Sequence, residues 1–175
     1  MKTLSEQLTQ YALYHRDPRN IATHFVGIPM IVFAVAVLLS RPVLVVSGLE
    51  LSPATVVVVL SCLYYLKLDL IMGVLMTVLF GSALYGAASL AALPTSEWLM
   101  WGIGLFVVGW VFQFVGHFYE GKKPAFVDDI SGLIIGPLFV ACELLFLLGA
   151  CSALKNEVEK GAGVVAIRQG KKAEA

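Results

Sequence analysis

The chain has three histidines, and each lies where polar sequence meets apolar sequence. His15 and His24 flank the beginning of the first long apolar run, and His117 stands at the end of a later one, three residues before Glu120. Neutral imidazole binds iron, zinc and copper, and two histidines with one carboxylate hold non-haem iron while leaving positions open for oxygen and substrate. We therefore predict that these four residues form a metal site.

The carboxylate of this set has alternatives. The spacing of His117 and Glu120 resembles the way in which helices of di-iron bundles direct a histidine and a glutamate to one metal. Glu120 could instead form an ion pair with one of the two lysines that follow it. Asp128 and Asp129 are expected to cap the last long helix, although either could replace Glu120 as the ligand.

A bend between His15 and His24 is needed to bring both rings to one point. Nine positions of an unbroken helix would place the two side chains on opposite faces, at about 100° per residue. Asp17-Pro18 predicts the bend, because the residue before proline is driven out of the helical region. Proline is also favoured at the first position of a new helix, with Asp17 as its cap. Asn20 and His24, four residues apart, share one face of that helix.

Two further polar side chains interrupt apolar sequence. Gln113 lies one helical turn before His117. Glu143 lies within the last apolar run, and ionisable groups at membrane depth are costly and usually functional. We expect Glu143 to assist the site from outside the ligand set or to handle protons. A buried partner or a protonated, hydrogen-bonded state is the alternative.

Composition indicates a membrane protein. Of the 175 residues, 59% are hydrophobic and 14% are charged, and the mean hydropathy is +0.86, far from the soluble average. Twelve basic and twelve acidic residues cancel, so no global field for nucleic acid is expected. The chain has no nucleotide-binding motif, and its three cysteines lack the close pairing of a zinc or redox motif. The N-terminal segment is too polar for a cleaved signal peptide.

Apolar runs predict an all-α fold, a polytopic integral membrane helical bundle with about five transmembrane helices. The runs cover residues 21–40, 53–66 and 70–93, a stretch that ends at Gly116, and residues 133–154. The second run is short enough to be re-entrant instead. Residues 1–154 are expected to form a single helical membrane domain, and the charged tail 155–175 is expected to be largely disordered.

An interfacial amphipathic helix is predicted at the N-terminus. Thr3 and Glu6 match a capping box, in which each side chain satisfies a free backbone donor of the other. The apolar face that follows at helical spacing comprises Leu4, Leu8, Tyr11 and His15. Such a helix lies on the membrane or against a bundle.

The predicted topology places both histidine-bearing segments on one side of the membrane. Short segments on that side carry more lysine and arginine than the opposite loops, which indicates the cytoplasmic side. Lys155 and Lys160, near the last helix, lie on the opposite side in this topology and weaken the difference in basic residues between the two sides. We expect an integral protein of the bacterial inner membrane, or of the endoplasmic reticulum in a eukaryote, with its metal site at the cytoplasmic face.

Both histidine-bearing segments carry a larger set of residues that matches one family. The set comprises Tyr14, His15, Asn20, His24–Pro29, Gln113–His117, Glu120, Pro124, Ala125 and Pro137. It resembles the signature of the 2-hydroxy fatty acid dioxygenases, small membrane proteins of fungi and bacteria. The resemblance implies an iron(II) enzyme of fatty acid α-oxidation, which uses molecular oxygen to shorten a 2-hydroxy fatty acid by one carbon. It also implies that His15, His24 and His117 are essential, with Glu120 or a neighbouring acid as the carboxylate.

The layout suits such a substrate. A 2-hydroxy acid can chelate iron through its carboxylate and hydroxyl, leaving a position for oxygen, while its acyl chain runs between apolar helices. Asn20, Gln113 and Glu143 are expected around the ligands. Arg16 or Arg19 could pair with the substrate carboxylate, as could the lysines after Glu120; a plain surface charge is the alternative for each.

Two other functions stay open at this point. A zinc hydrolase of a lipid amide or ester could use the same three histidines, with water activated at the metal. A non-enzymatic membrane scaffold or small transporter would use them structurally, although their clustering on one predicted side argues against it. The expected partners are a 2-hydroxy fatty acid, oxygen and the lipid bilayer, with Fe²⁺ as the cofactor and no nucleotide.

Overall fold

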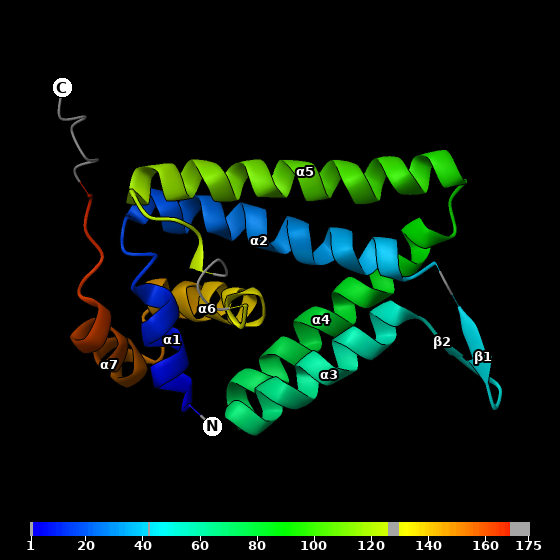
Figure 1. Cartoon of the computed structure of the whole chain (residues 1–175). Coiled ribbons are helices and arrows are strands. Elements are labelled where there is room, and N and C mark those ends of the chain that lie inside the picture. Colours follow the sequence, from blue (N-terminus) through cyan, green and yellow to red (C-terminus); the bar gives the residue numbers. More distant parts are fainter. Residues whose placement is uncertain (1, 42, 126–129, 169–175) are drawn as a thin grey trace. The chain divides into compact units, whose positions relative to one another are not determined.

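The structure is a computed structural model that describes residues 2–41, 43–125 and 130–168. Within these ranges it consists of helices and one short antiparallel strand pair, which confirms the all-α class (Figure 1). The elements are α1 (Leu4–Ala12), α2 (Pro18–Leu39), β1 (Leu44–Val46), β2 (Leu49–Leu51), α3 (Pro53–Leu68), α4 (Leu70–Ala91), α5 (Thr95–Glu120), α6 (Gly132–Leu147) and α7 (Ser152–Ala162).

The chain divides into two compact units. The first comprises residues 1–28 and 110–175, and the second comprises residues 29–109. Helices α2 and α5 therefore each have one end in the first unit and the other end in the second. All three histidines belong to the first unit, so this unit alone positions the candidate site.

Helix α1 begins with the predicted capping box. The Thr3 hydroxyl accepts a hydrogen bond from the backbone N–H of Glu6 at 3.3 Å, and the Glu6 carboxylate accepts one from the backbone of Thr3 at 2.8 Å. The apolar face of the helix, with Leu8 and Ala12 fully buried, packs against α6 and α7 (Figure 1). Because this face contacts protein, the predicted position of α1 at the membrane interface is not confirmed.

Apolar packing dominates the second unit. Helices α3 and α4 lie side by side as a helical hairpin (Figure 1), and Asp69 both ends α3 and caps α4. Gly73 permits their close approach, because an added Cβ would lie 2.5 Å from the Leu66 Cα. The Trp98 indole donates a hydrogen bond to the Val37 carbonyl at 2.9 Å and packs on a small alanine- and valine-lined core.

Three helices, α2, α4 and α5, are long and apolar enough to cross a membrane. A fourth span is counted if α6 and α7, which meet at a bend of 116°, act as one. Helix α3 has 16 residues, about 24 Å of rise, which is less than the bilayer core of about 30 Å. The predicted five transmembrane helices are therefore not confirmed, although helices occupy all five apolar runs.

A further helix, α7, follows α6 in the chain. Gly149 and Cys151, with φ of 80° and 54°, turn the backbone into α7, which buries Val158. Gly161 lies so close to Thr9 of α1 that an added Cβ would collide with its side chain. The buried side chain of Val158 and the small residue Gly161 thus dock α7 on α1, within the segment for which the sequence predicts a disordered tail from residue 155.

Candidate metal site

The structure brings all three histidines together in the first unit. Their ligand nitrogens lie within 4.8 Å of one another, and the ring centroids are 4.6 to 5.1 Å apart. His15 comes from the segment between α1 and α2, His24 from α2 and His117 from α5. The first two are 0% exposed and the third 7%. Within the described residues, they form the one group of three or more candidate ligands at such distances.

The predicted bend turns His15 toward His24. Helix α1 ends at Ala12, and α2 begins at Pro18, the position that the sequence indicates. Asp17 acts as the expected cap, because its carboxylate accepts a hydrogen bond from the backbone N–H of Arg19 at 2.9 Å. The two histidine Nε2 atoms consequently lie 3.1 Å apart.

The hydrogen bonds of these two rings define their tautomers. His15 Nδ1 lies 2.8 Å from the Tyr11 carbonyl oxygen, and His24 Nδ1 lies 2.9 Å from the Asn20 carbonyl oxygen. A carbonyl only accepts, so each Nδ1 carries the hydrogen and each neutral ring presents an unshared electron pair at Nε2. Two such electron pairs, on nitrogens that face each other at 3.1 Å, repel each other unless both of them bind a cation. Burial, together with the neighbouring histidines, holds the pKa of His15 well below its usual range, which disfavours a proton as that cation.

This donor set fits a metal ion. The separation of 3.1 Å is less than twice a metal–imidazole bond of about 2.1 Å, so both nitrogens can contact one ion. A carbonyl that holds the second ring nitrogen is the usual support of a metal-bound histidine. Tyr11 adds a second support, because its ring stacks on His15 at 4.1 Å with an angle of 3° between the planes.

Helix α5 delivers the third histidine through a close approach to α2. An added Cβ at Gly116 would collide with the side-chain oxygens of Thr23 and Asn20 and would lie 3.2 Å from His24 Nδ1. Glycine is therefore required for His117, the next residue, to reach the other two rings.

Four buried polar atoms on α2 and α5 have no hydrogen-bond partner within the described part of the chain. They are Asn20 Oδ1, Gln113 Nε2, His117 Nδ1 and Glu120 Oε1, of which the last lies at ion-pair distance from Arg168. Buried polar atoms in proteins are almost always paired, so unpaired atoms on the two helices that carry His24 and His117 are a further sign of a site built to hold something else. Gln113 is 5% exposed and lies one turn before His117, as the sequence indicates.

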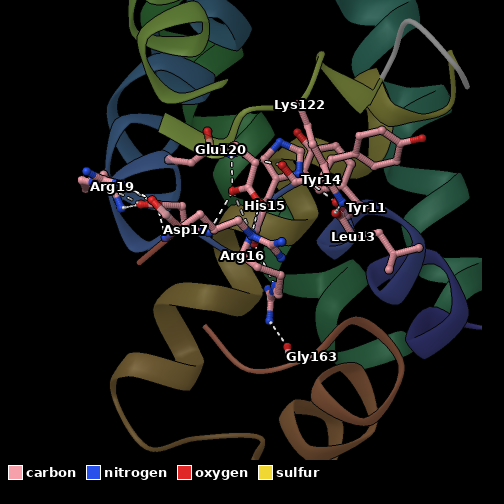
Figure 2. Close-up of polar contacts among 12 residues, drawn as sticks. Tyr11, Leu13, Tyr14, His15, Arg16, Asp17, Arg19, Glu120, Lys122 and Gly163 are labelled. Carbon is pink, nitrogen blue, oxygen red and sulfur yellow. Dashed lines mark hydrogen bonds and ion pairs between the residues drawn. The ribbon is translucent and has the colours of Figure 1, made fainter. Parts of the chain in front are cut away.

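Glu120, predicted as the carboxylate ligand, is not among the groups that the structure brings together at the metal site. Its Oε2 accepts hydrogen bonds from the backbone N–H groups of Arg16 and Asp17, at 3.0 and 2.8 Å, and from the Asn20 amide at 3.1 Å (Figure 2). The backbone N–H groups at the beginning of a helix have no partner within the helix and attract a carboxylate, so Glu120 pairs with the bend. The alternative ligands Asp128 and Asp129 lie outside the described residues.

Arg16 is buried, with 2% of its surface exposed, and has its partners within the chain. Its guanidinium pairs with Glu143 at 2.7 Å, and its Nε donates to the His15 carbonyl at 2.9 Å. Its Nη1 also donates to the Gly163 carbonyl at 3.3 Å (Figure 2). Glu143 thus has the buried partner that the sequence left open, and it acts on the backbone of a candidate ligand through Arg16.

Arg19 also has partners within the chain. Its guanidinium binds the Asp17 carboxylate at 2.7 and 3.0 Å and lies 4.6 Å from the centre of the Tyr119 ring. These hydrogen bonds hold the pKa of the Asp17 carboxyl well below its usual range. The Lys122 ammonium donates to the Leu13 carbonyl at 2.8 Å (Figure 2). Both cations thus contact residues of the segment between α1 and α2.

Sequence reasoning missed two contributors. The stacking of Tyr11 on His15 was available as a signal, because the two residues are four apart on one helical face. Arg168 pairs with Glu120 at 2.9 Å across 48 residues of chain, and no local pattern indicates such a contact.

Comparison with known proteins identifies relatives of the chain. A protein-family model described as "2-hydroxy-palmitic acid dioxygenase Mpo1-like" matches residues 1–148. A relative from Saccharomyces cerevisiae, named "2-hydroxy-palmitic acid dioxygenase MPO1", is 33% identical over 160 residues, which cover 89% of this chain and 87% of the relative. No solved structure matches the chain significantly. The chain belongs to the 2-hydroxy-palmitic acid dioxygenase Mpo1-like family.

Proposed function

We propose that the protein is an iron(II)-dependent dioxygenase that shortens 2-hydroxy fatty acids by one carbon, with His15, His24 and His117 as its metal ligands. The observation that carries the proposal is the pair of imidazole nitrogens that face each other at 3.1 Å with their other nitrogens held by carbonyls. That arrangement is stable only around a cation. The names of the family and of the yeast relative support a 2-hydroxy fatty acid as the substrate class.

The chain supplies three neutral ligands, which leaves other coordination positions of an iron ion open. Iron(II), when bound there, would supply the redox chemistry that oxygen needs to react with an organic acid. The carboxylate and hydroxyl of a 2-hydroxy acid suit a site with several open positions, and the unpaired Asn20 Oδ1 and Gln113 Nε2 are available to orient them. The enclosing residues keep bulk water away, because the three rings are buried.

The electron balance needs no additional reductant. Oxidation of a 2-hydroxy acid to the acid one carbon shorter and carbon dioxide releases four electrons, and the reduction of one oxygen molecule to water takes up four. Substrate and oxygen therefore suffice, in keeping with the absence of a nucleotide-binding motif from the sequence. We further propose an integral membrane position with the metal site at the cytoplasmic face, since three helices are long and apolar enough to cross a bilayer.

The test uses full-length protein purified without a polyhistidine tag and loaded with iron(II). Oxygen uptake is measured with 2-hydroxypalmitate and, as the matched control, with palmitate, which lacks the second chelating oxygen. We expect uptake and the acid one carbon shorter only with the hydroxy acid. Activity should disappear on chelation and return with iron(II) but not with zinc. Product formation without oxygen, or cleavage of a lipid ester or amide by the zinc-loaded protein, would contradict the proposal in favour of a hydrolase.

A further inference from the structure

Residues 163–168, here called the C-terminal strap, lie against the bend that carries His15. The strap follows α7 and lies beyond residues 1–148, the part of the chain that the family model matches. The first two contacts of the strap are hydrogen bonds between its backbone and Arg16. Arg16 donates to the Gly163 carbonyl at 3.3 Å (Figure 2), and the Ala166 N–H donates to the Arg16 carbonyl at 3.0 Å. The strap therefore holds Arg16, the residue next to a proposed metal ligand, from both its side chain and its backbone.

Arg168 makes the other contacts of the strap. Its backbone N–H donates to the Asp17 carboxylate at 2.8 Å, and its carbonyl accepts a hydrogen bond from Arg19 at 3.0 Å. Its Nε lies 2.9 Å from Glu120 Oε1, at ion-pair distance although the N–H does not point at the oxygen. One residue thus joins the two buried carboxylates that border the bend.

These carboxylates need cations because both are buried. Asp17 is 0% exposed and Glu120 is 4% exposed, and a buried charge without a partner is strongly unfavourable. Asp17 pairs with Arg19, whereas the ion pair of Glu120 among the described residues is with Arg168. Glu120 Oε2 meanwhile holds the N–H groups of Arg16 and Asp17. Arg168 neutralises the group that fixes the backbone beside His15.

We propose that Arg168 is a positioning residue of the metal site, acting through Glu120 on the bend that presents His15. The inference rests on the proposed function, since it assumes that the three histidines bind the metal. It goes beyond that function because it assigns a role in metal binding to Arg168, which lies outside the residues that the family model matches. The proposal requires that the effect of Arg168 on metal binding depends on Glu120, because Arg168 acts on the bend through that carboxylate.

The experiment measures the dissociation constant for iron(II) under anaerobic conditions, together with kcat and KM for 2-hydroxypalmitate, in full-length variants. Arg168→Gln removes the cation, Arg168→Lys keeps it, and truncation after Arg168 serves as the matched control because it retains every contact described for the strap. We expect Arg168→Gln to weaken iron binding about tenfold or more, the range seen when a group that supports a metal ligand is lost. Arg168→Lys should restore most of the affinity, and the truncation should bind like the wild type.

A double-mutant cycle with Glu120→Gln separates positioning from simple anchoring of the chain end. The loss caused by Arg168→Gln should shrink to less than about twofold when Glu120 is already neutral. An equal loss in both backgrounds, or wild-type iron affinity in Arg168→Gln, would overturn the inference. If Arg168→Gln does not fold, the same comparison is made with Arg168→Lys, whose affinity must then lie between wild type and Glu120→Gln. Wild-type protein that binds no iron would instead reject the proposed function itself.

Discussion

The two units of the chain bury very different kinds of side chain. In the described part of the second unit, the buried polar residues are three serines: Ser40, Ser52 and Ser61. Among the described residues of the first unit, nine buried ones are polar or charged: His15, Arg16, Asp17, Asn20, His24, Gln113, His117, Glu120 and Glu143. Helices of similar apolar character thus build a plain scaffold in one place and a dense polar network in the other.

The difference indicates which unit carries the function. The Ser40 hydroxyl donates a hydrogen bond to the Ala36 carbonyl in the last turn of α2 at 2.7 Å, which costs the fold little. The buried pair Arg16–Glu143 and the facing rings of His15 and His24 are costly arrangements that packing alone does not require. Such a network is retained at a site that binds or reacts, and breaking its members should have effects that the serines do not share.

The largest effect is expected from the histidines. Replacing His15, His24 or His117 singly by alanine should lower iron affinity by more than about 100-fold, because two ligands cannot hold the ion in an open site. Thermal unfolding in detergent should show it: iron should raise the Tm of the wild type but not of the variants. Ser40→Ala is the control from the second unit and should respond to iron as the wild type does. Iron stabilisation that survives loss of all three histidines would remove the basis of the site.

The next largest effect concerns the buried ion pair. Glu143→Leu leaves the Arg16 guanidinium buried without its carboxylate, and we expect the free energy of unfolding to fall by about 3 kcal/mol. The partly exposed helical pair Lys155–Glu159, at 3.8 Å, provides a comparison close to Glu143, since Glu159→Gln should cost less than about 0.5 kcal/mol. Chemical unfolding in detergent measures both. Similar losses of unfolding free energy in the two variants would show that the buried ion pair contributes no more to stability than the helical pair.

A smaller effect is expected where α5 approaches α2. Gly116→Ala adds a methyl group against Asn20 and Thr23, so we expect α5 to move outward and iron affinity to fall by about tenfold, equivalent to about 1.4 kcal/mol. Gly104→Ala changes the same helix within the second unit, where nothing lies within 4 Å of the added Cβ, and should be neutral or slightly stabilising. If the two variants bind iron equally, the close approach does not position His117.

Local chemistry made part of the site predictable. Proline cannot continue the hydrogen bonding of the preceding helix, so Asp17-Pro18 required a bend between His15 and His24 whatever the rest of the chain did. The capping box at Thr3 and the five apolar helices follow from equally local rules. The number of spans was less predictable, because α3 and α6 are apolar yet end early.

The amino-acid sequence alone determined the chemistry available to this protein: three imidazoles at polar boundaries, a bend that could join two of them, and apolar helices to carry them. Only the tertiary structure decided which partner each buried glutamate binds. Glu120 binds the bend and Glu143 binds Arg16, across 104 and 127 residues of chain, and Arg168 completes the network from the far end. Such contacts depend on how helices pack after the chain has folded, and no spacing within a helix encodes them.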